Sequence, residues 1–118
     1  MAVRKISSTN ALNEIFLQEK CILNKVLKIV GKRWASEILL LVEKDIFRFS
    51  EIKEKLDGIS DNVLSQSLNE LVKSGLLQKK IFQQVPLKVE YSLTKKGKSL
   101  THQLHQLCQW GKQNVELE

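Results

Sequence analysis

The apolar residues of this chain recur at helical spacing along most of its first half. Residues 12–16 and 21–30 each carry an apolar stripe that predicts an amphipathic helix, and Gly31 can end the second of them. A third stripe predicts a helix over residues 32–44. This third stripe consists of Trp34, Ile38, Leu41 and Val42.

Turn and capping residues divide the segment that follows residue 44. Residues 47–49 are typical of a very short strand at the edge of a small sheet. Ser50 is a candidate cap for a helix over residues 50–56, and Gly58 supplies a tight turn. A longer amphipathic helix then spans residues 60–74. Two helices joined by such a turn form a helix-turn-helix, which presents its second helix to a DNA groove.

The helix predicted over residues 60–74 has two chemically different faces. Ser60 can cap its start, and at about 100° per residue its apolar side chains gather on one side. The other side is polar; amides and hydroxyls occur on ordinary wet surfaces too, but they also suit base edges. Their place in the first half of a second helix favours the DNA interpretation. The core face is Leu64, Leu68, Leu71 and Val72, and the predicted base contacts are Asn62, Ser65, Gln66 and Asn69.

A basic hairpin follows this helix. Residues 77–93 read as two short strands around Pro86, and the second strand alternates with Val89, Tyr91 and Leu93 directed inward. Thr94 can cap a final helix. A hairpin placed directly after a helix-turn-helix is the wing of a winged helix.

The net charge is concentrated around this hairpin. The chain has 19 Lys+Arg and 13 Asp+Glu, a formal net charge of +6. Residues 72–100 hold seven lysines and only one acid, Glu90, which accounts for the whole excess. A polyanionic partner explains this placement, because neutralised phosphates release condensed counterions; a solvated lysine face that aids solubility is the alternative. The predicted contacts to the DNA backbone are Arg48, Lys53, Lys79, Lys80, Gln84 and Lys88.

Length and composition bound the class of protein. The 118 residues, 42% of them hydrophobic, suit a single globular domain. No apolar run reaches the ~20 residues of a membrane span, and the N-terminus lacks the pattern of a secretory signal. Two separated cysteines do not make a secreted disulfide framework. We therefore expect a cytoplasmic protein.

Motifs for catalysis or metal binding are weak. No glycine-rich phosphate loop, nucleophile elbow or paired-carboxylate motif occurs, so we expect no enzyme and no cofactor. His102, His105 and Cys108 share one predicted helix, but steps of three residues drift about 60° around a helix. Structural zinc also needs four ligands, and we expect no metal site.

Five runs of residues are distinctive: 31–34, 48–53, 58–66, 107–110 and 86–97, the last containing Val-Glu-Tyr-Ser-Leu-Thr-Lys-Lys-Gly. These runs resemble those of the HxlR-type transcriptional regulators. The resemblance covers about residues 21–111 and implies a homodimeric bacterial regulator that dimerises through its terminal helices. Two departures occur: the family usually has Gly-Gly-Lys-Trp in place of the Gly-Lys-Arg-Trp at residues 31–34, and Cys-Pro in place of Cys21-Ile22.

The terminal segments carry two further predictions. The last helix has a narrow apolar seam spaced by three and four residues, and a helix at the end of a small domain has little core left to cover. Some members of the resembling family sense oxidants or electrophiles through an N-terminal cysteine, which makes Cys21 a candidate redox sensor. Its position at a helix start near two lysines suits a reactive thiol, although a small buried hydrophobe is the other interpretation. The seam residues, predicted to form the dimer interface, are Leu100, Leu104 and Leu107.

Together these patterns predict a mainly α fold with a small antiparallel β-hairpin (α+β): a winged helix-turn-helix with additional N- and C-terminal dimerisation helices. The single domain spans residues 1–118, with a DNA-binding core over about 32–93 and terminal helices over about 11–31 and 94–115. The predicted function is transcriptional regulation by a homodimer bound to double-stranded DNA, with an unknown effector. The alternative is a winged-helix protein-interaction module without DNA binding, whose wing would be apolar or acidic.

Overall fold

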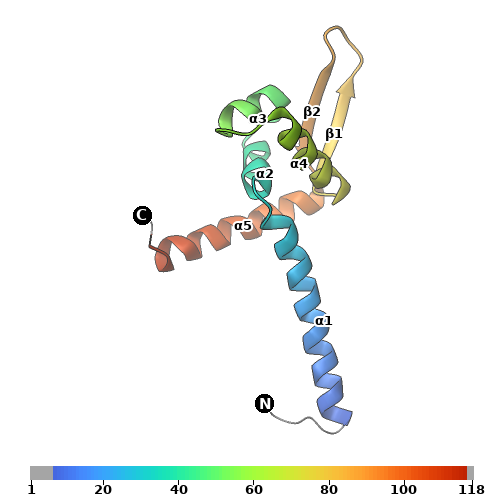
Figure 1. Ribbon diagram of the computed structural model, residues 1–118, viewed down its shortest axis with the longest axis vertical. Coiled ribbons are helices and arrows are strands. Elements are labelled where there is room, and N and C mark those ends of the chain that lie inside the picture. The colour runs from blue at the N-terminus through green and yellow to red at the C-terminus, as the bar shows by residue number, and fades with distance from the viewer. Residues whose placement is uncertain (1–6, 117–118) are drawn as a thin grey trace. The chain divides into compact units, whose positions relative to one another are not determined.

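The computed structural model describes residues 7–116 and confirms the predicted winged helix (Figure 1). The chain divides into two compact units, Met1–Lys32 and Arg33–Glu118, and each is described by itself. None of the described helices is long and apolar enough to cross a membrane. The elements are α1 (Ser7–Val30), α2 (Ala35–Glu43), α3 (Phe49–Lys55), α4 (Asp61–Lys73), β1 (Leu77–Phe82), β2 (Lys88–Leu93) and α5 (Lys95–Asn114).

The first unit contains one continuous helix, α1, of 24 residues. The sequence predicted two shorter helices here, and that prediction was wrong. The polar residues between the two apolar stripes (Gln18, Glu19 and Lys20) are good helix formers, and neither glycine nor proline interrupts them. The helix therefore continues to Val30. Its exposed large apolar side chains are Leu12, Ile15, Phe16, Leu17, Ile22, Leu23, Val26 and Leu27.

The second unit begins with a backbone turn that shortens α2. The helix was predicted from residue 32 but starts at Ala35, because Trp34 adopts a left-handed conformation with φ 78°. A left-handed residue cannot continue a right-handed helix. The Arg33 guanidinium lies over the Trp34 ring, 4.5 Å from its centroid. The side chains that α2 buries are Ala35, Ile38, Leu39 and Val42, two of which the predicted stripe contained.

The start of α3 also differs from the prediction. Ser50 is not the cap of this helix but lies within its first turn, since the helix begins at Phe49 and Arg48 occupies the cap position. Arg48 is extended (φ −96°, ψ 147°) and forms an isolated antiparallel bridge with Glu90. The predicted strand over residues 47–49 is thus reduced to this one bridge. A long-range pairing, which local propensity does not reveal, determines where α3 begins.

The turn and the second helix of the helix-turn-helix match the prediction closely. Gly58 has φ +85°, a conformation that favours glycine. The Ser60 hydroxyl accepts a hydrogen bond from the Val63 N–H at 3.1 Å and caps α4. The inner face of α4 buries Leu64, Leu68 and Leu71.

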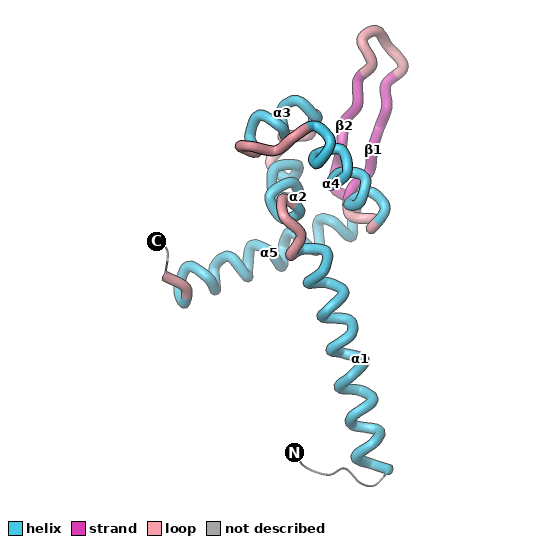
Figure 2. The backbone as a smooth tube through the Cα atoms, in the orientation of Figure 1, coloured by secondary structure: helices cyan, strands magenta, loops and turns pink. Residues whose placement is uncertain are grey.

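The strands β1 and β2 form the antiparallel hairpin of the wing. Their register pairs Leu77 with Leu93 at the base and Phe82 with Lys88 near the tip. Tyr91 is buried near the base, and burial raises the pKa of its phenol. Burial declines towards the tip because the hairpin extends past the helices of its unit (Figures 1 and 2). The predicted inward–outward alternation therefore holds only near the base.

Hydrogen bonds at the base of the hairpin explain the Leu-Thr-x-x-Gly pattern of residues 93–97. The Thr94 hydroxyl accepts a bond from the Gly97 N–H at 2.9 Å, which confirms the predicted cap of α5, and donates to the Gly75 carbonyl at 2.6 Å. The Thr94 N–H donates to the Leu76 carbonyl at 3.1 Å. A Cβ atom on Gly97 would overlap that carbonyl oxygen, so only glycine allows this approach. Residues 93–97 thus join the start of α5 to the end of α4.

Candidate nucleic-acid interface

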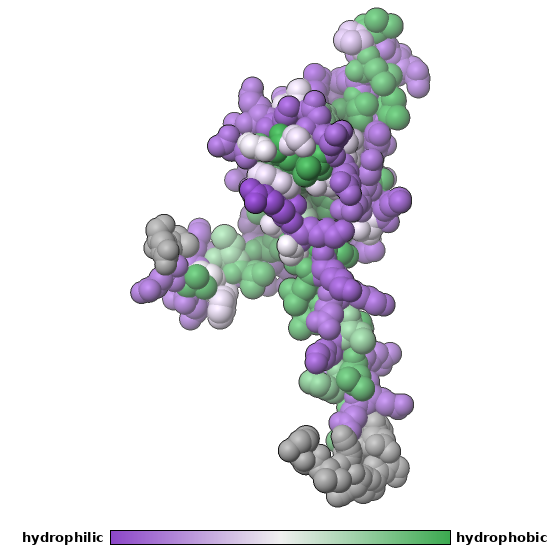
Figure 3. Space-filling model, viewed as in Figure 1, coloured by the Kyte–Doolittle hydropathy of each residue, from purple (hydrophilic) through white to green (hydrophobic). Residues whose placement is uncertain are grey.

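The outer face of α4 presents the polar side chains that the sequence predicted as base contacts. All four are exposed, and no hydrogen bond or ion pair involves their side chains within residues 7–116. Ser60 caps the helix and the buried leucines hold the opposite face, so the orientation of this surface is determined by the core. Hydrophilic residues cover much of α3 and α4 in Figure 3. The four residues are Asn62, Ser65, Gln66 and Asn69.

A predicted backbone contact, Lys53, lies at the start of this surface. Its Nζ atom is 2.7 Å from Asp61 Oδ1, so an ion pair links α3 to the first turn of α4. Both side chains are exposed, and ion pairs of this kind contribute only about 0–1 kcal/mol. Lys53 is therefore able to exchange Asp61 for a phosphate at little cost.

The stem of the wing carries the other predicted cations. Lys79 is exposed, and its ammonium has no partner in the described part of the chain. Lys80 and Lys88 place their Nζ atoms 5.2 Å and 4.9 Å from the centroid of the Phe82 ring. Cation–π contacts of this kind hold an ammonium in place without neutralising its charge. The stem is therefore a positively charged ribbon.

Three predicted backbone contacts come together in one hollow. Arg48, Gln84 and Lys88 line a cavity of about 430 Å³ between the start of α3 and the wing. The sequence separates Arg48 from the other two by more than thirty positions, and the bridge between Arg48 and Glu90 brings them together. The remaining lining residues are Phe49, Ser50, Pro86, Leu87 and Val89.

Glu90 forms ion pairs with two of the residues that line this hollow, a role that the sequence did not reveal. Its Oε2 atom is 3.8 Å from Arg48 Nε and 3.2 Å from Lys88 Nζ. The carboxylate thus sits between two of the cations assigned to the DNA backbone. The only signal in the sequence was that Glu90 is the sole acid of residues 72–100.

The far end of the wing is apolar, a feature that was not predicted from the sequence. Val85 and Leu87 are exposed in the connection between the strands, and Ile81 is exposed near the end of β1. Figure 3 shows hydrophobic residues gathered at this end of the hairpin. The ribbon therefore combines a cationic stem with an apolar tip.

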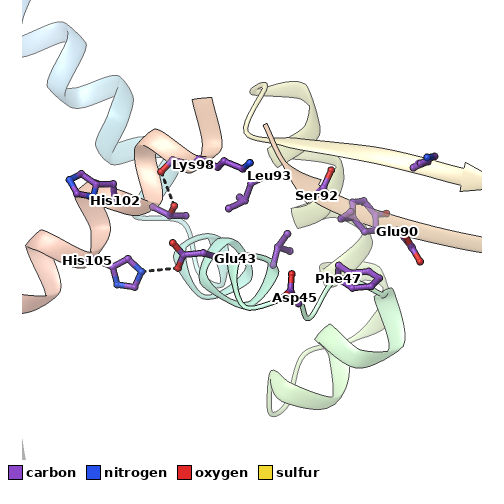
Figure 4. A pocket seen from close by; sticks show the side chains of 13 residues that line it. Glu43, Asp45, Phe47, Glu90, Ser92, Leu93, Lys98, His102 and His105 are labelled. Carbon is purple, nitrogen blue, oxygen red and sulfur yellow. Dashed lines mark hydrogen bonds and ion pairs between the residues drawn. The ribbon is translucent and has the colours of Figure 1, made fainter. Parts of the chain in front are cut away.

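A second groove, of about 760 Å³, lies between the end of α2, β2 and the start of α5 (Figure 4). In this groove His105 Nε2 and Glu43 Oε1 are hydrogen-bonded at 2.7 Å, which ties α5 to α2. His105 is thus engaged by a carboxylate. No group of three His, Cys, Asp or Glu residues able to hold a metal ion occurs among the described residues.

The predicted dimer seam is only partly covered by its own unit. Leu100 and Leu104 are half-buried, whereas Leu107 is 60% exposed and Trp110 beyond it is 58% exposed. Cys21 on α1 and Cys108 on α5 are exposed free thiols. Cys21 lies in the middle of the continuous helix Ser7–Val30, and the prediction that it lies at a helix start was wrong.

Comparisons with known proteins agree with this geometry. The model of the HxlR-like helix-turn-helix family matches residues 29–118. The regulatory protein MalR from Fusobacterium mortiferum is 42% identical over 96 residues, which cover 80% of this chain and 91% of MalR. A solved structure of a MarR-family transcriptional regulator from Enterococcus faecalis V583 is similar with a TM-score of 0.75 and 32% identity, over 80% of this chain and 86% of that one. The redox regulator HypR in its oxidised form has a TM-score of 0.73 and 30% identity, over 82% of this chain and 100% of HypR.

Proposed function

The chain belongs to the HxlR-like helix-turn-helix family of transcriptional regulators, which are not enzymes, and on that premise we propose that it is a homodimer that reads a specific operator with α4. The observation that carries the proposal is the outer face of α4, with four exposed amide and hydroxyl groups that have no partner among residues 7–116. Asn and Gln can pair bidentately with adenine, and Ser can donate or accept. The cytoplasm, where bacterial DNA lies, is the proposed location.

In the proposed complex, the wing and α3 hold the DNA backbone. Arg48, Gln84 and Lys88 share one hollow, and Lys79 and Lys80 extend the positive surface along the stem. Such contacts fix register and orientation without reading sequence. Base recognition is thus assigned to α4, and contacts with the DNA backbone are assigned to the wing and α3.

Gln66→Ala and Lys80→Ala are expected to separate these two tasks. Gln66→Ala should cost about 1–3 kcal/mol on the operator and little on random DNA, because it removes a base contact. Lys80→Ala should weaken binding to operator and to random DNA by similar factors, because it removes a phosphate contact. The number of ions released on binding, given by the salt dependence of the affinity, should fall by about one. Titrations of both duplexes at several salt concentrations measure this, with an operator obtained by genome-wide mapping of bound sites. If Lys80→Ala left random-DNA binding unchanged, the assignment would be wrong.

The same proposal assigns dimerisation to the terminal helices. α1 exposes a row of large apolar side chains, and α5 exposes Leu107 and Trp110. A second copy of the chain would cover these surfaces and give a two-fold symmetric particle. Its two reading helices would then lie about one DNA turn (~34–36 Å) apart, as half-sites of an operator require.

Cys21 is proposed as a redox sensor within this dimer. Its thiol is exposed on α1, and a similar structure is that of a redox regulator. Oxidation to a sulfenic acid, for which hypochlorite transfers its oxygen to the thiolate and leaves as chloride, or to a disulfide between subunits, would alter the spacing of the reading helices. In the disulfide case two thiols lose two protons and two electrons, which diamide accepts.

Diamide is accordingly expected to change the operator affinity of the wild type and not that of Cys21→Ser. Mobility shifts before and after oxidant measure the effect, and Cys108→Ser is the matched control because Cys108 is the other exposed thiol. Cys108→Ser should respond like the wild type. An equal response from Cys21→Ser, or an unresponsive wild type, would leave Cys21 without a sensing role.

A further inference from the structure

We propose that Arg48 and Lys88, which line the hollow between α3 and the wing, form a phosphodiester site whose two cations are engaged by the Glu90 carboxylate in the free protein. Glu90 thereby lowers the electrostatic affinity of the protein for any DNA. This inference rests on the proposed DNA-binding function and adds to it an acidic group that opposes DNA binding.

The backbone holds Glu90 against both cations. The bridge between Arg48 and Glu90 joins the residue before α3 to β2, and the Tyr91 N–H donates to the Phe47 carbonyl at 3.0 Å beside it. Because of this pairing the Glu90 side chain, 24% exposed, reaches Arg48 Nε at 3.8 Å and Lys88 Nζ at 3.2 Å. The backbone pairing therefore determines the position of Glu90, which does not result from a chance contact between surface side chains.

The cations around this carboxylate suit a phosphate. Guanidinium and ammonium groups bind carboxylate and phosphate oxygens through the same charge-assisted hydrogen bonds. Lys88 is further positioned by the Phe82 ring, whose centroid is 4.9 Å away. Gln84 and Ser50 line the hollow and add neutral hydrogen-bonding groups. A DNA phosphate and the Glu90 carboxylate are thus equivalent ligands for one site.

Binding at this site is an exchange. A phosphate that enters takes Arg48 and Lys88 from Glu90, and the displaced carboxylate then lies next to the negative DNA backbone. Both changes weaken binding, and neither depends on base sequence. Because Glu90 neutralises these cations in the free protein, fewer condensed ions are released when they meet DNA. Because Glu90 weakens binding to random DNA and to the operator alike, it lowers the fraction of the protein bound to DNA and leaves the specificity ratio unchanged.

Glu90→Gln is the direct test, because glutamine has the same shape without the charge. Affinity for random DNA and for the operator should rise by about three- to tenfold at 0.1 M salt, and the salt dependence should steepen by about one ion. Glu37→Gln is the matched control: Glu37 is exposed on α2, away from the hollow, and makes no ion pair in the described residues. It removes the same charge and should change affinity much less.

A second comparison identifies Lys88 as the partner of Glu90. Lys88→Ala should reduce affinity more in the Glu90→Gln background than in the wild type, because Glu90 no longer neutralises the lysine. The double variant keeps the net charge of the wild type, and its thermal unfolding verifies that the wing remains folded. Equal effects of Glu90→Gln and Glu37→Gln, or additive effects with Lys88→Ala, would overturn the inference. A wild type that binds no DNA would instead contradict the proposed function itself.

Discussion

Leu104→Asp is expected to convert the protein to a monomer and to abolish high-affinity operator binding. Leu104 lies in the apolar seam of α5, half-buried in its own unit, next to the exposed Leu107. A carboxylate placed in an apolar interface loses its hydration without gaining a partner, which costs several kcal/mol. A monomer would contact only one half-site and lose the contacts of the second reading helix.

Sedimentation velocity and operator titration measure these two results. Gln109→Asp is the matched control, since it adds the same charge to an exposed position on the opposite side of α5. Leu107→Asp is a second test, because Leu107 is 60% exposed in its own unit and its replacement leaves the core of the single chain intact. Folded variants that remain dimeric would show that the seam does not form the interface.

Gly97→Ala is expected to destabilise the fold by about 1–3 kcal/mol or more, the range of overpacking in a tight site. The added Cβ would overlap the Leu76 carbonyl oxygen and lie 3.1 Å from Leu93 Cδ2. The carbonyl cannot easily move, because it accepts the Thr94 N–H bond at 3.1 Å. The junction that joins the reading helix to α5 would therefore have to distort.

Urea unfolding measures the loss, and Gly111→Ala is its control. Gly111 is also in α5, but a Cβ atom added there would meet nothing within 4 Å apart from the neighbouring backbone of its own helix, so alanine at this position should stabilise the helix by about 1 kcal/mol. Equal stability of Gly97→Ala and the wild type would mean that the close approach is not required.

The parts of the fold that the sequence predicts correctly are those set by local signals. The α4 helix, the Gly58 turn and the Thr94 cap each depend on residues within four positions, so periodicity and capping rules identify them. The start of α3 depends instead on the pairing of Arg48 with Glu90, forty-two positions away. The start of α2 depends on a left-handed Trp34, a conformation that large residues rarely adopt.

The features of the candidate site also divide into those that local signals predict and those that depend on long-range contacts. The exposed face of α4 follows from helical periodicity, and the sequence places its four polar residues correctly on that surface. The ion pairs of Glu90 and the bond from Lys96 Nζ to the Ser74 carbonyl, at 3.1 Å, join residues of different elements. Lys96 thereby engages a carbonyl at the negative end of α4, which favours a cation although Lys96 lies in the first turn of α5. Such partners are fixed by tertiary packing and have no local signature.

The most direct test of a sequence-specific DNA interface on α4 and the wing is a titration of the wild-type protein with two duplexes. One duplex is a mapped operator, and the other is a scrambled sequence of the same composition. The operator is expected to bind at least about 10³-fold more tightly at physiological salt. Both affinities should fall steeply as salt increases, because the wing and α3 contribute phosphate contacts to each complex. Equal affinities for the two duplexes at every salt concentration would contradict sequence-specific recognition by this protein.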